Sequence, residues 1–376
     1  MKLYEYVIRR LVLMVFVLLA VSVIVFVITR GVPSPTYALA PYITPRMTDP
    51  QKLQTAVGLG IAEPSCPSWV DFTQSAPGCI TPLYVQYFSW LKQVLSGNWG
   101  NSVIPSIGVG QSTWGLFVAR FPYTAELAVA AALITVLFAL PMGIVSATHN
   151  NKVPDHFSRI VALVGYSMPV FWLAFILQII FVIYLTLTIP GNTFGLLPSS
   201  QTVGTDCALC IPNPGNINTY TGAPILDAIL SLNPAYFWDA LLALILPAIT
   251  LAFSTLGALT RIVRSSMMEA LRQDYILLAR SKGLRERTVI YRHALKNALL
   301  PAITITGLIL ASLLGGAVVV EEVFSWPGVG QAALDASLFL DINFLELYTL
   351  VTALIIVVAN LGVDVLYAFI DPRIRY

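Results

Sequence analysis

Six long runs of apolar residues constrain the fold of this chain more than any other feature. The runs lie at residues 11–28, 122–147, 157–188, 239–263, 301–320 and 345–369. A helix needs about 20 residues to cross the hydrocarbon core of a bilayer. Hydrophobic residues fill 57% of the 376 positions and charged residues only 11%, unlike the balance of a soluble domain. The sequence predicts an all-α, polytopic membrane protein with six transmembrane helices.

Positive charges gather in some of the segments between these runs and predict the orientation. Nine Lys and Arg residues lie between Arg261 and Lys296, and others precede the first run, separate the second run from the third, and follow the last. Cytoplasmic loops carry an excess of Lys and Arg. These segments share one side only if both termini are cytoplasmic. We therefore expect a multi-pass protein of the cell membrane, and the small net charge of +2 gives no reason to expect a nucleic-acid partner.

The first run could alternatively be a cleaved signal peptide, because Ala38 and Ala40 offer a small-residue cleavage site. The stretch from Leu11 to Ile28 exceeds the usual apolar region of such peptides, so we interpret it as an anchor. The external loop that follows is amphipathic from Tyr84 to Leu95, with Trp90 on the face expected to lie on the membrane surface. The predicted organisation comprises the N-terminus and first span (1–30), an external loop (31–121), a core of four spans (122–320) with a cytoplasmic loop (264–300), and a last loop, span and C-terminus (321–376).

Four cysteines fall in the two large loops predicted to be external. Cys66 and Cys79 lie in the first loop, and Cys207 and Cys210 in the second. Disulfides are favoured outside the cytoplasm, although the sequence leaves three connectivities open. The Cys207-x-x-Cys210 pair could also be half of a zinc ligand set, but no second half follows, so no metal site is predicted. We expect Cys66 to pair with Cys79, and Cys207 with Cys210 as a weaker bridge.

The cytoplasmic loop between the fourth and fifth runs carries the most specific pattern. A first helix is expected from Ser265 to Lys282, ended by Gly283, because glycine favours the C-terminal end of a helix. A second is expected over residues 285–299, with Pro301 opening the fifth span. Two short helices joined at a glycine form a rigid projection that can transmit force from a soluble partner. The alternative is a solvated basic loop that only obeys the charge bias.

Several motifs of this loop resemble a known family. The chain reads Asp274-Tyr275, then Ala279-Arg280-x-Lys282-Gly283-Leu284, then His293-Ala294-Leu295-x-Asn297-x-Leu299-Leu300-Pro301. This resembles the cytoplasmic loop of ABC-importer permeases, and most closely the B-type subunit of the dipeptide, oligopeptide and nickel permeases. Relative to the general ABC pattern, the chain departs at Leu277, Leu278, His293 and Lys296. Further similar stretches are Trp99-Gly100-Asn101-Ser102, Pro169-Val170-Phe171-Trp172, Glu321-Glu322-Val323-Phe324 with Pro327-Gly328-x-Gly330, and Asp371-Pro372-Arg373-Ile374-Arg375.

The resemblance implies an ABC type I importer permease fold and half of a translocation pathway for di- and oligopeptides. It also implies a second homologous permease subunit, two ATP-binding cassette ATPase subunits and an external substrate-binding protein, besides membrane lipid. The chain lacks a glycine-rich phosphate-binding motif, so ATP and Mg²⁺ are expected on the partners, with no cofactor and no catalytic residue here. Coupling to the ATPases is assigned to Asp274, Tyr275, Ala279, Arg280, Lys282, Gly283, Leu284 and Arg285.

Asn360 and Asp364 are the notable polar pair of the last span, four residues apart and therefore on one helical face. An ionisable residue inside a span is a functional hypothesis by default, but Asp364 is close enough to the inner end of the span to reach the interface. The pair is therefore assigned to packing or assembly, with a substrate or gating role as the alternative.

The sequence leaves other functions open. The same machinery could carry oligosaccharides or nickel chelates. A secondary transporter would instead be expected to show paired broken helices in related halves and ion-coupling groups at the midplane. A receptor or a structural membrane protein without transport would not copurify with ATPase subunits.

Overall fold

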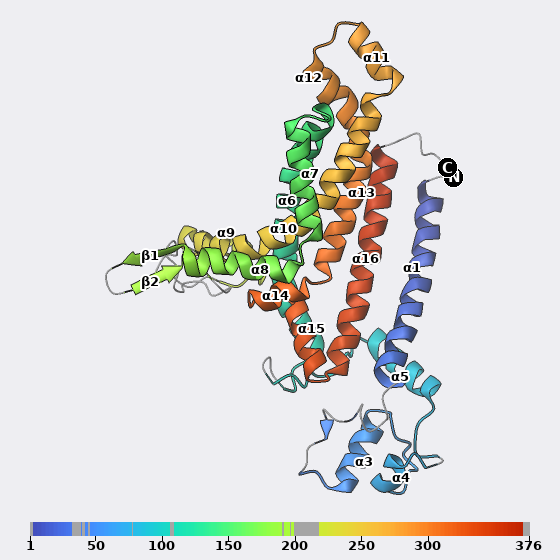
Figure 1. Ribbon diagram of the computed structural model, residues 1–376. Helices are drawn as coiled ribbons and strands as arrows, with labels where there is room; N and C mark the ends of the chain where they lie inside the picture. Colours follow the sequence, from blue (N-terminus) through green and yellow to red (C-terminus); the bar gives the residue numbers. More distant parts are fainter. Residues whose placement is uncertain are drawn as a thin grey trace. The chain divides into compact units, whose positions relative to one another are not determined.

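Helices form nearly all of the regular structure of this chain. The computed structural model describes residues 3–31, 39, 42–43, 46–76, 78–105, 109–189, 192–195, 197–198 and 218–370 (Figure 1). The long elements are α1 (Leu3–Phe26) with the short π-helix η1 (Val27–Gly31), α6 (Thr113–Thr148), α7 (Val153–Ser167), α8 (Val170–Gln178) with the π-helix η3 (Ile179–Tyr184), α10 (Pro234–Leu271), α13 (Leu295–Leu314) and α16 (Ile342–Ile370). Shorter helices are α3 (Asp49–Gly58), α4 (Trp69–Thr73), α5 (Leu83–Leu95), α9 (Pro224–Leu230), α14 (Val318–Val323) and α15 (Val329–Leu338). Strands β1 (Thr186–Ile189) and β2 (Asn192–Gly195) form one antiparallel hairpin.

Five of the described helices are long and apolar enough to cross a membrane, within α1–η1, α6, α10, the helix ending at Leu314, and α16. The sixth predicted span, residues 157–188, is not a straight helix. It is a pair, Val153–Ser167 and Val170–Tyr184, bent by 102°. Met168 is extended before Pro169, because a proline disfavours helical geometry in the residue that precedes it. Counted as one broken span, the pair completes the six predicted spans.

The chain divides into two compact units, and each is described separately. Unit 1 comprises residues 1–8, 120–331 and 355–376, and unit 2 comprises residues 9–119 and 332–354. In unit 1, α10 packs along α7 and α13. Two glycines bring α7 and α10 together: a Cβ on Gly257 would collide with the carbonyl oxygen of Ala162, and one on Gly165 would lie 2.6 Å from that of Phe253. The close approach of these backbones therefore depends on glycine.

The Glu-Glu-Val-Phe and Pro-Gly-x-Gly motifs of unit 1 enclose one buried carboxylate. Glu321 is fully buried and accepts hydrogen bonds from Thr124 Oγ1 and the Gln331 amide, each 2.9 Å long. Gly328 and Gly330 pack against it, and a Cβ at Gly330 would lie 2.8 Å from Glu321 Oε2. The glycines are needed because the carboxylate occupies the space that their side chains would fill.

Unit 2 contains the first external loop as a small folded body. Buried Leu39, Ala56 and Phe72 pack around the cysteine pair of this loop. Helix α5 confirms the predicted amphipathic segment. Its tryptophan does not face the membrane surface as expected: Trp90 is 7% exposed, and its ring lies 5.4 Å from that of Phe26 in α1.

The Trp-Gly-Asn-Ser motif of unit 2 is positioned by the start of α16. Ser102 Oγ donates to Asp341 Oδ2 at 2.5 Å, and both residues are buried. Gly100 has a φ of +76°, and a Cβ there would meet the Asn343 side chain at 2.6 Å. In the same unit the Arg30 guanidinium forms an ion pair with Glu346 at 3.0 Å.

Non-reducing peptide mapping is expected to recover Cys66 and Cys79 in one cross-linked peptide. The two residues are bonded in the structure and are 13 positions apart. Closing a loop of this size lowers the conformational entropy of the unfolded chain and stabilises the fold by about 3 kcal/mol. The Cys66→Ser variant should make the loop around α3 and α4 more sensitive to protease, while its spans still insert. Recovery of both cysteines as free thiols would contradict the bridge. Cys207 and Cys210 lie outside the described residues, so their pairing stays a prediction.

Candidate functional site: the coupling segment

The coupling segment, residues 272–294, links α10 to α13 and contains α11 (Asp274–Ser281), α12 (Glu286–Thr288) and the short π-helix η4 (Val289–Ala294). The predicted helix from Ser265 to Lys282 is wrong in its continuity: α10 ends at Leu271, and Gln273 is extended before α11 starts. A fresh helix start suits Asp274, whose carboxylate lies at the positive N-terminal end. The second helix continues through η4 into α13, so Pro301 lies inside α13 and does not open it.

Gly283 forms the predicted corner after α11. Its φ is +73°, a conformation that costs L-residues with a side chain but not glycine. The Gly283 amide donates to the Arg280 carbonyl at 2.9 Å and the Leu284 amide to the Ala279 carbonyl at 3.4 Å. This pair of bonds is the Schellman arrangement, which satisfies the last carbonyls of a helix. Apart from its two chain neighbours, no described residue comes within 4 Å of the position that a Cβ on Gly283 would take, so backbone conformation selects glycine here.

A small core holds the coupling segment in one shape. Ile276 and Ala279 occupy one face of α11 and are 0% and 6% exposed, and they belong to the same cluster as buried Val289 and Ala294. Arg280 Nη2 also donates to Glu286 Oε1 at 2.6 Å across the corner. This hydrogen bond raises the pKa of the Arg280 guanidinium above its usual range. The two helical arms are therefore fixed to each other by apolar packing and by one surface ion pair.

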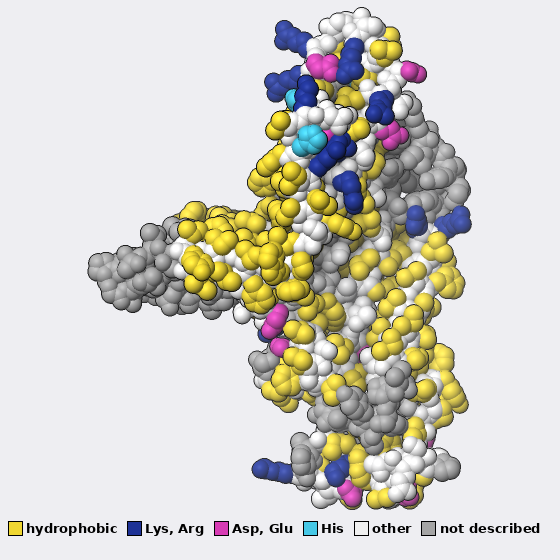
Figure 2. Space-filling view, in the orientation of Figure 1, with side chains coloured by type: hydrophobic (Ala, Val, Ile, Leu, Met, Phe, Trp, Pro, Cys, Tyr) yellow, Lys and Arg dark blue, Asp and Glu magenta, His cyan; other side chains and the backbone are white. Residues whose placement is uncertain are grey.

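The opposite face of the coupling segment exposes apolar side chains. Leu277 is 68% exposed, Leu278 56% and Leu284 40%. Figure 2 shows Lys and Arg side chains gathered around this end of unit 1, with hydrophobic side chains covering the helices below them. Leucines grouped on a charged projection outside the apolar spans are typical of a protein-docking surface. Of the residues predicted to couple, Asp274, Tyr275, Arg280, Lys282, Gly283, Leu284 and Arg285 are exposed, and Ala279 is buried beneath them.

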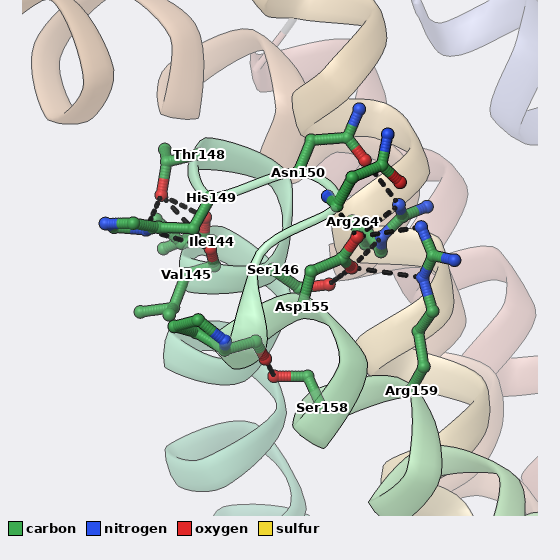
Figure 3. A network of polar contacts seen from close by, with 12 residues as sticks. Ile144, Val145, Ser146, Thr148, His149, Asn150, Asp155, Ser158, Arg159 and Arg264 are labelled. Atoms are coloured by element: carbon green, nitrogen blue, oxygen red, sulfur yellow. Dashed lines mark hydrogen bonds and ion pairs between the residues drawn. The ribbon is translucent and has the colours of Figure 1, made fainter.

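A buried aspartate joins three helices on the coupling-segment side of unit 1 (Figure 3). Asp155 of α7 is fully buried. Its Oδ1 accepts from Ser146 Oγ of α6 at 2.6 Å and from Arg264 Nε of α10 at 2.8 Å, and its Oδ2 accepts from Arg159 Nη2 at 2.7 Å. Arg264 Nη2 also donates to Asn150 Oδ1 at 3.0 Å. This cluster ties α10, just before the coupling segment, to α6 and α7.

The Asp155 cluster was not anticipated from the sequence. The spacing of Asp155 and Arg159 allows an ion pair on one helix, but Arg264 lies 109 residues further along the chain. No pattern in the neighbouring sequence indicates that Arg264 is the partner of Asp155.

The Asp155→Asn variant should lower the free energy of unfolding by about 2–3 kcal/mol, because it leaves two arginines around a site that has lost its charge. Because Arg159 is half-exposed, this loss is expected to fall at or below the lower bound of the usual cost, which is about 3–5 kcal/mol. Thermal unfolding of the purified protein in detergent measures the change. Glu286→Gln is the matched control: it removes one partner of an exposed pair, which is worth about 0–1 kcal/mol. Equal midpoints for the two variants would contradict the structural role of the buried cluster.

The polar pair predicted in the last span, Asn360 and Asp364, lies in α16. The side chain of Asp364 is outside the described residues, and the gating or packing role of the pair stays a prediction. Among the described residues no group of three or more His, Cys, Asp or Glu could hold a metal ion.

The six spans, with a helical projection that exposes leucines between two of them, define a polytopic membrane component. The chain belongs to the family of inner membrane components of binding-protein-dependent transport systems, which it matches over residues 139–376. It is 35% identical to a dipeptide transport system permease protein of Alkalihalophilus pseudofirmus, over 99% of both chains. It is 31% identical to an oligopeptide transport system permease protein of Bacillus subtilis, again over 99% of both. The dipeptide transport system permease protein of Escherichia coli is 37% identical over 80% of this chain and 83% of the relative.

Proposed function

We propose that this chain is the transmembrane permease subunit of an ATP-driven importer of di- and oligopeptides and forms half of its translocation pathway. The observation that carries the proposal is the coupling segment, where a fixed corner presents exposed Leu277, Leu278 and Leu284 outside the apolar spans. The names of the relatives, which describe dipeptide and oligopeptide permeases, support the substrate class.

The proposed assembly contains a second homologous permease subunit, two ATPase subunits that bind ATP and Mg²⁺, and an external substrate-binding protein. This chain holds no nucleotide and no cofactor in that arrangement. Closure of the ATPase subunits moves the coupling segment, and the membrane helices then switch between inward-facing and outward-facing states. Its role is transport, and the hydrolysis takes place on the partner subunits.

Uptake into proteoliposomes tests the proposal. The complex isolated through this chain is reconstituted with its binding protein, ATP is enclosed on the coupling-segment side, and labelled di- and oligopeptides are added outside. ATP-dependent accumulation of peptides is the expected result. Accumulation of oligosaccharides or of nickel chelates alone would support ATP-driven import but reject peptides as the substrate class. Accumulation driven by an ion gradient without ATP would indicate a secondary transporter and reject both.

A further inference from the structure

A second site lies in unit 1, beside the Asp155 cluster and between α7 and α10. A pocket of about 410 Å³ opens there, a size within the range of ligand pockets. Its lining contains Arg159, Arg261 and Arg264 together with Tyr166 and Thr260. We infer that this pocket holds the phosphate headgroup of an anionic phospholipid from the cytoplasmic leaflet.

The pocket carries an excess of positive charge, which favours binding of an anion. Three arginines line it, and the carboxylate that reaches two of them is Asp155. Arg159 and Arg264 each use Nε and Nη2 on polar partners of this cluster. The Arg261 guanidinium lies 5.4 Å from the centre of the Tyr166 ring, and within the described ranges it forms no ion pair. Arginine is suited to phosphate because its donors are arranged as a planar fork.

An unsatisfied buried hydroxyl gives independent support for a ligand. Thr260 is 2% exposed, and its Oγ1 has no hydrogen-bond partner among the described residues. Buried polar side chains in native proteins nearly always have a partner. Because Thr260 lines the same pocket as the arginines, a phosphate oxygen or a lipid carbonyl there would provide the missing acceptor.

The shape of the site favours a lipid over a free anion. From the arginines the lining continues along α7 to apolar Ala162, Leu163 and Tyr166. Leu163 is 67% exposed and Tyr166 65%, so the wall next to the charged end is an apolar surface of a membrane-spanning segment. A phospholipid presents the same sequence of chemistry, a phosphate followed by acyl chains. Basic pockets between helices at the cytoplasmic side are suited to anionic headgroups.

Photocross-linking in nanodiscs tests the inference on the intact complex isolated through this chain. The photoreactive analogue p-benzoylphenylalanine replaces Leu163, and the nanodiscs contain equal amounts of phosphatidylglycerol and phosphatidylcholine. Mass spectrometry of the labelled peptide identifies the attached lipid. Both lipids carry a phosphate, but the choline cation of phosphatidylcholine is repelled by the arginines that line the pocket. Phosphatidylglycerol should therefore be favoured by about tenfold, which corresponds to about 1.4 kcal/mol.

Two variants distinguish the pocket from the general charge of the surface. Arg261→Gln, which removes a guanidinium that lines the pocket, should return the ratio of the two lipids close to one. Lys152→Gln removes an exposed positive charge at the start of the same α7 without touching the pocket, and it should leave the preference unchanged. A further variant, Thr260→Val, should weaken the preference without changing the charge.

Three results would overturn the inference. A ratio of one in the unmodified background would show ordinary bilayer lipid, and cross-links to another subunit would show that a protein fills the pocket. Loss of the lipid cross-link in millimolar inorganic phosphate would show a site for free anions. None of these readouts depends on peptide transport, so they are independent of the proposed function.

Discussion

Replacing Gly283 with valine is expected to remove most substrate-stimulated ATP hydrolysis while the protein still inserts and assembles. Positive φ costs about 1–2 kcal/mol for an ordinary L-residue, and a β-branched side chain is penalised further. The native corner should therefore be populated roughly tenfold less. Because no described residue other than its chain neighbours lies within 4 Å of a Cβ at this position, the loss would come from a changed direction of α11 and not from a steric collision. ATP turnover in proteoliposomes, with and without loaded binding protein, measures it.

A graded series of variants makes this expectation specific. Gly283→Asn should retain most coupling, because asparagine tolerates the left-handed conformation better than other residues. Gly283→Ala should be intermediate. Arg285→Ala should be milder than either alanine or valine at the corner, since an exposed charge mainly adjusts docking strength. Full coupled uptake by the valine variant would remove the coupling segment from its assigned role and leave only the charge bias to explain its sequence.

Replacing Gly257 with valine is expected to prevent stable packing of α7 on α10. The new side chain would meet the backbone of Ala162, which cannot move aside as a flexible side chain can. Overpacking typically costs about 1–3 kcal/mol, and a collision with backbone belongs at or above the upper end. The yield of folded protein after size-exclusion chromatography and its thermal midpoint in detergent should both fall sharply.

Gly362→Val provides the matched control for this helix contact. Gly362 lies inside α16, and no described atom is within 4 Å of the position that a Cβ would take there. The same change of residue type therefore occurs in another membrane helix without a collision. Similar yields and midpoints for the two valine variants would show that the close approach of α7 and α10 is unimportant. Gly257→Ala should fall between wild type and valine.

Sequence reasoning predicted the features that depend on neighbouring residues. The lengths of the apolar runs predicted the spans, and Gly283 after a helical stretch predicted the corner. A proline such as Pro169 indicates that helix geometry is disrupted locally, whereas packing sets the angle of the bend, here 102°. The break between α10 and α11 at Gln273 was not predicted, because no proline or glycine lies there.

Tertiary partners were the main part that sequence reasoning missed. Trp90 lies on the apolar face of an amphipathic helix, and such a face suits a membrane surface as well as it suits another helix. Its contact with Phe26 depends on a residue 64 positions away in the chain. For the same reason the contact between Arg264 and Asp155 could not be predicted from the sequence. Periodicity identifies which face is apolar, but it does not identify what covers that face.

The glycine motif after α14 has a consequence for how related chains can vary. The carboxylate of Glu321 and the missing side chain of Gly330 share one small volume. A methyl group gained at position 330 would meet Glu321 Oε2 at 2.8 Å and the backbone of Val318 at 3.0 Å. Shortening Glu321 to aspartate removes the closer contact, and a small backbone shift at Val318 removes the other. Homologues that carry alanine at 330 should therefore tend to carry the shorter acid at 321. Residues 321 and 330 are therefore expected to covary among homologues, so that their combined side-chain volume stays nearly constant.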